Sequence, residues 1–354
     1  MTILINIASF LLLITILVFI HELGHFLAAK SIGLRVEKFY IGFNLFGLGL
    51  KKKIGETEFG IGLFPIGGYV KVAGMVDESF DDEYHGKPDE YVSKSMLQKV
   101  WFTSGGVIFN FILAFILFSS ITYYDGRNEP LNTNIIGGVI QDHPADKAGL
   151  LAGDEIMAID EVSVKSWDEM SNEITKKPDK TILLKYQRNN DIDTISVLTL
   201  SSLDIYGDTI GIIGIQSESE KLNPGFFKSI QYGFSDLVSW LKIMTVSIYS
   251  LFTGQVGIER FGGPIAIASI AGDASQAGIL SFIFFMAILS VNLGIINILP
   301  FPGLDGGHAL IAVIEGIMGR RIPFKVLMAI QQVGVLLLLI FFFIIMKNDI
   351  VKLF

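Results

Sequence analysis

Two histidines and a glutamate end an apolar stretch near the start of the chain, in the sequence LVFIHELGHFLAAK from Leu17 to Lys30. His21 and His25 are four residues apart, so in a helix both imidazoles would lie on one face, with Glu22 beside them. Two imidazoles so placed can hold Zn²⁺, and the glutamate can act as a base on a metal-bound water. The spacing therefore predicts a hydrolytic zinc site, with His21 and His25 as ligands and Glu22 as the catalytic base.

The position of this motif in a membrane span also favours function. Residues 3–20 carry no charge, and with a helical continuation to Ser31 they can cross about 30 Å of hydrocarbon. A chance cluster of histidines at the membrane interface is the alternative. That alternative leaves Glu22 unexplained, because ionisable groups inside spans are costly and normally functional. We therefore expect the three polar side chains to face the interior of a helix bundle.

A catalytic zinc site needs a third protein ligand and one open position. The chain has no cysteine, which leaves a carboxylate or one of the histidines His85, His143 and His308. His85 and His143 lie in polar segments typical of surface histidines, and His308 is a rival ligand or an outer neighbour of the site. Asp305 lies in NILPFPGLDGGHAL, and a helix broken at membrane depth must be buried in protein or line a water-filled cavity. Asp305, which alone would be explained as a helix cap, is the predicted third ligand.

The composition indicates a membrane protein. The chain has 354 residues, of which 51% are hydrophobic and 18% charged, and its mean hydropathy is +0.55. Soluble domains contain about 25% charged residues. The net charge of −8 gives no basic surface for nucleic acid, and the lack of cysteine excludes disulfides and cysteine-based metal chemistry. We predict a polytopic α-helical membrane protein with four transmembrane helices and one inserted polar domain.

The order of the predicted segments follows from the apolar runs and the turn signals between them. In sequence order they are a first transmembrane helix with the metal motif (1–32), a β-loop and acidic loop (33–97), a second transmembrane helix (98–123), a polar domain (124–222), an extracytoplasmic amphipathic segment (223–276), a third transmembrane helix (277–302), a segment with LDG and a cytoplasmic loop (303–325), and a fourth transmembrane helix (326–347).

The shared metal also predicts a topology. If the first and third spans both end at the zinc, they run in the same direction, and the polar domain lies on the opposite side of the membrane. Basic residues follow these two spans, at Lys51–Lys53 and at Arg320, Arg321 and Lys325. Because positive loops face the cytoplasm, we expect the zinc near the cytoplasmic side and the polar domain outside it.

These residues together resemble the site-2 proteases, which are intramembrane zinc metalloproteases, and most closely the bacterial RseP-type group. HELGH, LDGG at Leu304–Gly307 after Asn297, and a polar domain between the second and third spans carry the likeness. The resemblance implies one catalytic zinc and a membrane-associated β-loop, here GETEFGIGLFPIGGYVKVAGM. It further implies that Asn297, Asn110 in an F-N pair, Gly67 and Gly68 contact the substrate. Gly105-Gly106 departs from the Gly-Pro common in the family, and Asn44 follows Gly42-Phe43 in place of another glycine.

The polar domain resembles a PDZ domain, on the stretch from Gly137 to Met170. The carrying residues are Pro144-Ala145, Ala148-Gly149-Leu150 and Gly153-Asp154 before a strand. A PDZ groove accepts an extended peptide as an added strand. A generic small β-domain is the alternative.

The resemblance implies an endopeptidase of the bacterial inner membrane that cleaves transmembrane segments in regulated intramembrane proteolysis. Its expected substrates are membrane proteins such as anti-sigma factors or remnant signal peptides, and its expected partners include the lipid bilayer and a peptide C-terminus or substrate segment at the PDZ domain. The alternative is a membrane PDZ adaptor with a structural or vestigial zinc site. An intact Glu22 disfavours the adaptor, because a structural zinc site has no use for that base.

Overall fold

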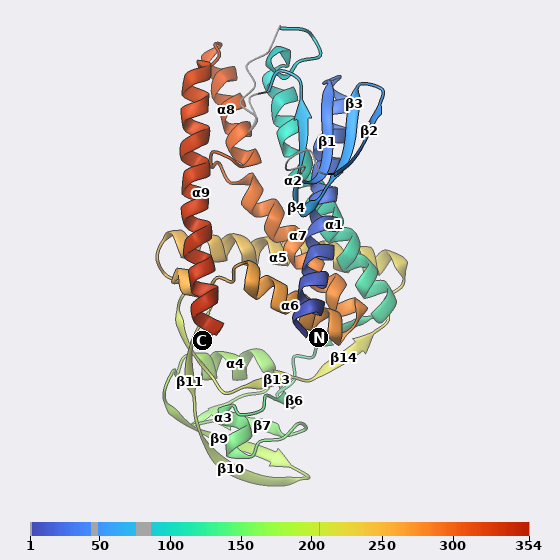
Figure 1. Ribbon diagram of the computed structural model, residues 1–354. Helices are drawn as coiled ribbons and strands as arrows, with labels where there is room; N and C mark the ends of the chain where they lie inside the picture. Colours follow the sequence, from blue (N-terminus) through green and yellow to red (C-terminus); the bar gives the residue numbers. More distant parts are fainter. Residues whose placement is uncertain (1, 44–48, 76–85, 205, 354) are drawn as a thin grey trace. The chain divides into compact units, whose positions relative to one another are not determined.

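The computed structural model describes residues 2–43, 49–75, 86–204 and 206–353 (Figure 1). The chain divides into two compact units. Unit 1 comprises Met1–Ile121, Ile230–Thr245 and Ile258–Phe354, and unit 2 comprises Thr122–Ser229 and Val246–Gly257.

Among the described residues, four helices are long and apolar enough to cross a membrane: α1 (Thr2–Ser31), α2 (Met96–Asp125), α7 (Ile279–Ile298) and α9 (Phe324–Leu353). The 20 residues of α7 rise about 30 Å, the thickness of a hydrocarbon core. The predicted segments 98–123 and 326–347 fall within α2 and α9. The predicted segment 277–302 extends beyond α7 at both ends, because Gly278, with φ of 129°, precedes the helix and Pro300 follows it.

Two further helices occupy most of the segment predicted to be amphipathic: α5 (Phe226–Phe252) and α6 (Pro264–Ala277), with a short 3-10 helix, η3 (Ile258–Arg260), between them. In the part of α5 that belongs to unit 1, Leu237 is buried while Phe234 and Val238 are exposed. Helix α6 packs closely on α1, where a side chain at Gly272 would overlap Asn6. This segment therefore carries one two-faced helix and one helix packed into the bundle.

A four-stranded sheet lies at one end of unit 1 (Figure 1). It consists of β1 (Val36–Phe43), β2 (Gly49–Ile54), β3 (Thr57–Gly62) and β4 (Phe64–Val72), in the order β2-β3-β1-β4. Strands β1 and β3 are parallel, and the other pairs are antiparallel. The ring of Phe26 on α1 packs 5.5 Å from Phe39 and 5.7 Å from Phe59, which fixes the sheet on the end of α1. Strand β4 lies at an edge, and it ends where the backbone N–H of Tyr91, in η2 (Tyr91–Ser93), donates to the Ala73 carbonyl.

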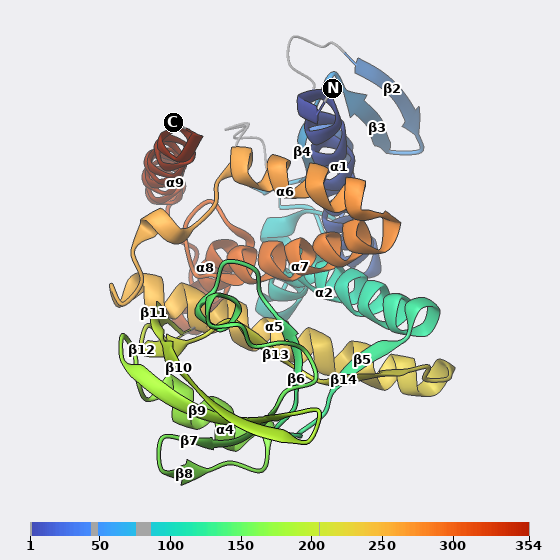
Figure 2. The same ribbon diagram turned by 90° about the horizontal axis from the view of Figure 1, so that it is seen from below.

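Two of the long helices of unit 1, α1 and α7, share a direction that matters for the site. Both α1 and α7 run toward the end that carries the sheet, and both chain ends lie at the opposite end (Figure 1). The apolar core between α1, α6 and α7 contains Leu13, Leu17, Ala271, Phe282 and Met286. Seen from below, α9 lies apart from α1 (Figure 2). Helix α9 is joined to α6 through buried Asp349, whose carboxylate accepts backbone N–H bonds from Gly263, Ile265 and Ala266.

Unit 2 is built from short strands and two helices. Its elements are β5 (Arg127–Pro130), β6 (Ile136–Val139), α3 (Pro144–Ala148), β7 (Glu155–Ile159), β8 (Val162–Ser163), α4 (Trp167–Thr175), β9 (Thr181–Arg188), β10 (Asp191–Leu198), β11 (Leu200–Leu203), β12 (Thr209–Ile212), β13 (Ile215–Ser217) and β14 (Ser219–Leu222). Strands β10-β9-β7-β8 form one sheet, and β11-β12, β13-β6 and β14-β5 form antiparallel pairs.

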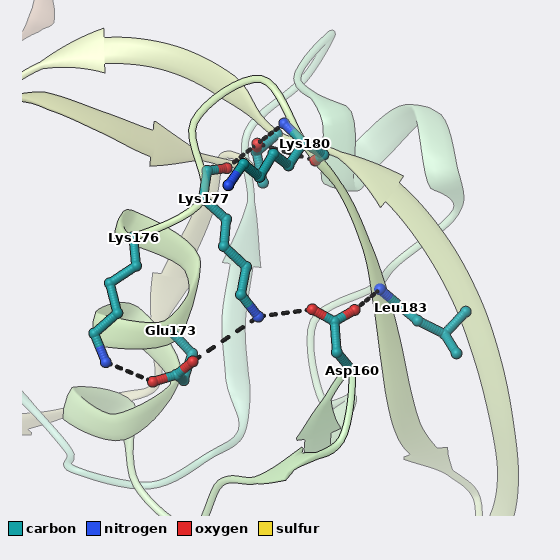
Figure 3. Close-up of polar contacts among 7 residues, drawn as sticks. Asp160, Glu173, Lys176, Lys177, Lys180 and Leu183 are labelled. Atoms are coloured by element: carbon teal, nitrogen blue, oxygen red, sulfur yellow. Dashed lines mark hydrogen bonds and ion pairs between the residues drawn. The ribbon is translucent and has the colours of Figure 1, made fainter.

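Alternation along β9 shows why this polar segment folds. Ile182, Leu184 and Tyr186 point inward at every second position and meet Met170 and Ile174 of α4 in one apolar core. Ion pairs and hydrogen bonds link polar residues on the surface around this core (Figure 3). Lys177 Nζ lies 2.7 Å from Asp160 Oδ2 and 3.9 Å from Glu173 Oε2, and Asp160 Oδ1 accepts the Leu183 N–H at 2.8 Å. These contacts tie the end of α4 to the sheet.

A buried carboxylate makes the stability of unit 2 depend on pH, with a loss of stability in acid. Asp154 accepts hydrogen bonds from Arg188 at 2.6 and 2.7 Å and from the Leu151 N–H at 2.8 Å. Burial raises the pKa of Asp154, but the bonds from Arg188 and Leu151 outweigh burial and hold this pKa below its usual value. A lowered folded-state pKa gives stability that is present above the unfolded pKa of about 3.9 and is lost as the pH falls through the folded value.

We therefore expect hydrogen-exchange protection of the β7 and β9 amides, corrected for intrinsic rates, to fall as the pH drops below about 4. Asp154→Asn should lower the protection at neutral pH and flatten its acid dependence, while Asp191→Asn at an exposed position should change neither. An unchanged acid dependence in Asp154→Asn would contradict this account.

Candidate metal centre

Three potential ligand atoms converge in unit 1, although they come from two distant parts of the chain. His21 Nε2 and His25 Nε2 each lie 3.2 Å from Asp305 Oδ2, and the two nitrogens are 3.3 Å apart. The histidines are buried on one face of α1, one turn apart. Asp305 is the first residue of α8 (Asp305–Met318). The three residues predicted as metal ligands are thus brought together.

The spacing of these three atoms fits zinc. A tetrahedral ion about 2.0–2.1 Å from its ligands has those ligands about 3.3–3.4 Å apart along each edge. The three atoms form a nearly equilateral triangle of that size, with edges of 3.2, 3.2 and 3.3 Å. Asp305 Oδ2 is also buried, and it lies against both imidazole nitrogens, as expected for an oxygen that shares a cation with them. Two imidazoles and a carboxylate leave the fourth position open for water.

The broken segment between α7 and α8 places Asp305. The last turn of α7 ends at Ile298, and the chain turns through two prolines and Gly303, whose φ is 93°. Gly306 and Gly307 then pack directly on the carbonyls of Ile298 and Phe301, where any side chain would overlap them. The two glycines after Asp305 therefore allow α8 to begin against the end of α7.

Helix α2 passes directly behind both histidines. An added Cβ at Gly106 would lie 2.5 Å from His21 Cε1 and 2.5 Å from His25 Nε2. His25 Nδ1 lies 3.0 Å from the Phe102 carbonyl oxygen, and His21 Nδ1 lies 3.0 Å from Asn110 Nδ2. The sequence marked Gly106 only as a departure from a family pattern, so its closeness to both imidazoles was missed.

Gly106→Ala should weaken zinc binding strongly, because its methyl group would displace both imidazoles. Helix propensity alone would make this substitution stabilising, because alanine is favoured over glycine in a helix interior by about 1 kcal/mol. A loss of zinc would therefore come from the methyl group and not from a weakened helix. Zinc content after dialysis against a chelator measures the change, and Ser104→Ala, on the same turn of α2, is the control. Zinc retention by Gly106→Ala equal to that of Ser104→Ala would contradict the argument.

Comparison with known proteins identifies the family to which this chain belongs. The sequence profile described as peptidase family M50 matches residues 9–341. The chain belongs to peptidase family M50, the site-2 protease family. It is therefore a zinc metalloendopeptidase by family, and the resemblance seen in its sequence is confirmed.

Relatives of this M50 peptidase match along nearly its whole length. A Clostridium perfringens protein whose name describes a zinc metalloprotease is 32% identical over 347 residues, covering 96% of this chain and 97% of its own. Zinc metalloprotease RasP of Geobacillus kaustophilus is 28% identical, covering 99% of this chain and 98% of its own. The solved PDZ domain of an SdrC-like protein of Listeria innocua matches at 29% identity with a TM-score of 0.21, over 27% of this chain and 99% of its own.

The M50 peptidase brings an edge strand against Glu22. Glu22 is buried, and an added Cβ at Gly68 of β4 would lie 3.0 Å from Glu22 Cγ and 2.8 Å from Val18 Cγ1. The preceding Gly67 has φ of 88°, a conformation that favours glycine. The backbone of β4 therefore runs beside the glutamate of the metal motif.

The remaining candidate residues of the M50 peptidase are not among the three converging ligand residues. Asn297 is half-buried in the last turn of α7, and among the described residues no hydrogen bond joins its side chain to the three ligand candidates. His308 lies one turn after Asp305, with Nε2 3.3 Å from Gln331 Nε2. His143 precedes α3 in unit 2, and His85 lies outside the described residues.

Proposed function

We propose that this M50 peptidase hydrolyses peptide bonds within or next to the transmembrane segments of membrane proteins. One zinc ion would be held by His21, His25 and Asp305. The observation that carries the proposal is the convergence of these residues near the ends of apolar helices: His21 and His25 in the C-terminal half of membrane-length α1, and Asp305 just after membrane-length α7. A hydrolytic centre at this depth suits a substrate that itself lies in the bilayer.

The residues around the site have separate tasks in this reaction. A zinc ion held by His21, His25 and Asp305 would supply a Lewis acid for the scissile carbonyl and would lower the pKa of a water to about 7. Glu22 accepts the proton of that water and later donates it to the leaving amine. Asn297 steadies the developing oxyanion or the substrate backbone, a role carried over from the family resemblance.

Strand β4 is the proposed docking site for the substrate. A helical segment hides its backbone in its own hydrogen bonds, so the substrate must unwind before hydrolysis. An extended segment can then pair with an exposed sheet edge through main-chain hydrogen bonds. Strand β4 lies at the edge of its sheet, and the close approach at Gly68 brings this strand against Glu22. Gly67 and Gly68 thus contribute to substrate binding through the path of their backbone.

Unit 2 is proposed to be a PDZ domain that binds a peptide C-terminus or a substrate segment. A cavity of about 230 Å³ lies between α4 and the β12–β13 region. Its walls are mainly apolar, with Ile140, Trp167, Met170, Ile174, Ile212 and Ile215 among the lining residues. An extended peptide with an apolar end residue suits such a groove.

The proposed location is the bacterial inner membrane, with the zinc toward the cytoplasm and the PDZ domain outside it. The parallel course of α1 and α7 supports this topology, as do the basic residues Lys51–Lys53, Arg320 and Arg321, which follow these two spans. Anti-sigma factors and remnant signal peptides are the proposed substrates, cleaved in regulated intramembrane proteolysis. A reporter fused after Lys185 should read as extracytoplasmic, and a cytoplasmic signal there would contradict the topology.

Cleavage of a single-span reporter by the purified full-length protein in detergent tests the proposed function. Cleavage should stop when zinc is removed by a chelator and return when zinc is restored. A matched reporter whose span is an uninterrupted polyleucine helix should be cut more slowly, because it resists unwinding. Zinc binding without cleavage of any single-span reporter would contradict the protease and favour an adaptor.

A further inference from the structure

One face of α2 forms the support behind the two histidines. Phe102, Gly106 and Asn110 follow at intervals of four residues, so they lie along one stripe of the helix. His25 Nδ1 meets the Phe102 carbonyl and His21 Nδ1 meets the Asn110 side chain, each at 3.0 Å. Both imidazoles therefore turn Nδ1 toward α2 and Nε2 toward Asp305.

The Asn110 side chain is buried with its amide oxygen unused. Its exposure is 0%, and among the described residues its Oδ1 has no hydrogen-bond partner, while Nδ2 is the atom that faces His21. The oxygen and nitrogen of an amide are nearly equal in size, so a half turn about the Cβ–Cγ bond exchanges them in the same space. After that exchange Oδ1 faces His21 Nδ1.

The amide oxygen is the atom that a metal-binding His21 requires. An imidazole that binds a metal through Nε2 carries its proton on Nδ1, and an acceptor at Nδ1 fixes both the tautomer and the ring orientation. The Phe102 carbonyl is such an acceptor for His25. For His21 the same position is occupied by the Asn110 amide.

We propose that Asn110 is a positioning residue, whose amide oxygen accepts a hydrogen bond from His21 Nδ1–H and thereby keeps His21 Nε2 directed at the metal. The family resemblance assigned Asn110 to the substrate, but its place behind the imidazole gives it this different role. The inference rests on the proposed zinc site.

Zinc affinity of the purified full-length protein, measured by competition with a chromogenic chelator, tests the role without any substrate. Asn110→Leu, which keeps the volume and removes the acceptor, should weaken zinc binding by about 10- to 100-fold, the range found for lost outer partners of metal-binding histidines. Asn110→Asp, which keeps an acceptor, should retain the affinity. Ser290→Ala is the matched control, because Ser290 Oγ donates to the main-chain carbonyl of Asn110 at 2.8 Å and leaves its amide untouched.

A cobalt-substituted protein adds a readout that a packing role would not move. The visible absorption of Co²⁺ should change in Asn110→Leu and remain as in the wild type for Asn110→Asp and Ser290→Ala. Asn110→Ala replaces Asn110→Leu if the latter does not fold. Wild-type affinity in Asn110→Ala, or an equal loss in Asn110→Asp and Asn110→Leu, would overturn the inference. Failure of the wild type itself to bind zinc would instead contradict the proposed function.

Discussion

Glu22→Gln should abolish reporter cleavage while leaving zinc bound. Glutamine has the shape of glutamate but cannot accept the proton of the attacking water, so kcat should fall by about 10²- to 10⁴-fold, the usual contribution of a positioned acid–base group. Glu22 provides none of the three converging ligand atoms, so zinc should stay bound in the variant. The contact of Gly68 with Cγ of residue 22 is also kept by glutamine, so β4 should not move.

The controls for Glu22→Gln separate chemistry from folding. Glu22→Asp keeps the carboxylate but withdraws it by one methylene, and a misplacement of about 1 Å can cost about 10²-fold in rate. Its activity should fall between that of the wild type and that of Glu22→Gln. Zinc content and cleavage of the single-span reporter are measured on the same preparations. Undiminished cleavage by Glu22→Gln would remove the glutamate from the reaction.

Asp305→Ala should lose zinc, and activity with it. Its carboxylate oxygen is one of the three atoms at the centre of the site, 3.2 Å from each imidazole nitrogen. Loss of an outer partner weakens metal binding by about 10- to 100-fold, so loss of a direct ligand should exceed about 100-fold. Chelator competition on the purified protein measures the affinity.

His308→Ala is the control for Asp305→Ala, because it lies one turn further along α8 and was the rival ligand in the sequence. His308 faces Gln331 at 3.3 Å, so its removal should leave zinc affinity near that of the wild type. Zinc loss in His308→Ala together with zinc retention in Asp305→Ala would exchange the two assignments. Asp305 also occupies the first turn of α8, so thermal unfolding of both variants shows whether helix stability contributes.

The parts of the site that could be predicted are those encoded by local spacing. His21 and His25 share a face because they are four residues apart, and Asp305 was found because prolines and glycines break an apolar segment around it. Four membrane-length helices could be read from apolar runs in the same way. The boundary predicted at 276/277 lies next to Gly278, which separates α6 from α7, but the division of segment 223–276 into α5 and α6 was not predicted.

The support from α2 could not be predicted from spacing. Phe102 lies 77 residues from His25, and Asn110 lies 89 residues from His21, and no local pattern relates positions so far apart. Gly106 is recognisable only once the distance of α2 from the imidazoles is known. The backbone carbonyl of Phe102 carries no side-chain signal at all.

If a substrate docks on β4 as proposed, the end of β4 at Tyr91 limits where that substrate can be cut. The Tyr91 N–H already occupies the Ala73 carbonyl, so a segment paired with β4, as proposed, would have to leave the sheet after Val72. Glu22 lies beside Gly68, four residues before that stop, which corresponds to about 13 Å of extended chain. With the substrate docked on β4 as proposed, the scissile bond would lie at a set number of residues from the point where the substrate leaves the sheet, whatever its sequence.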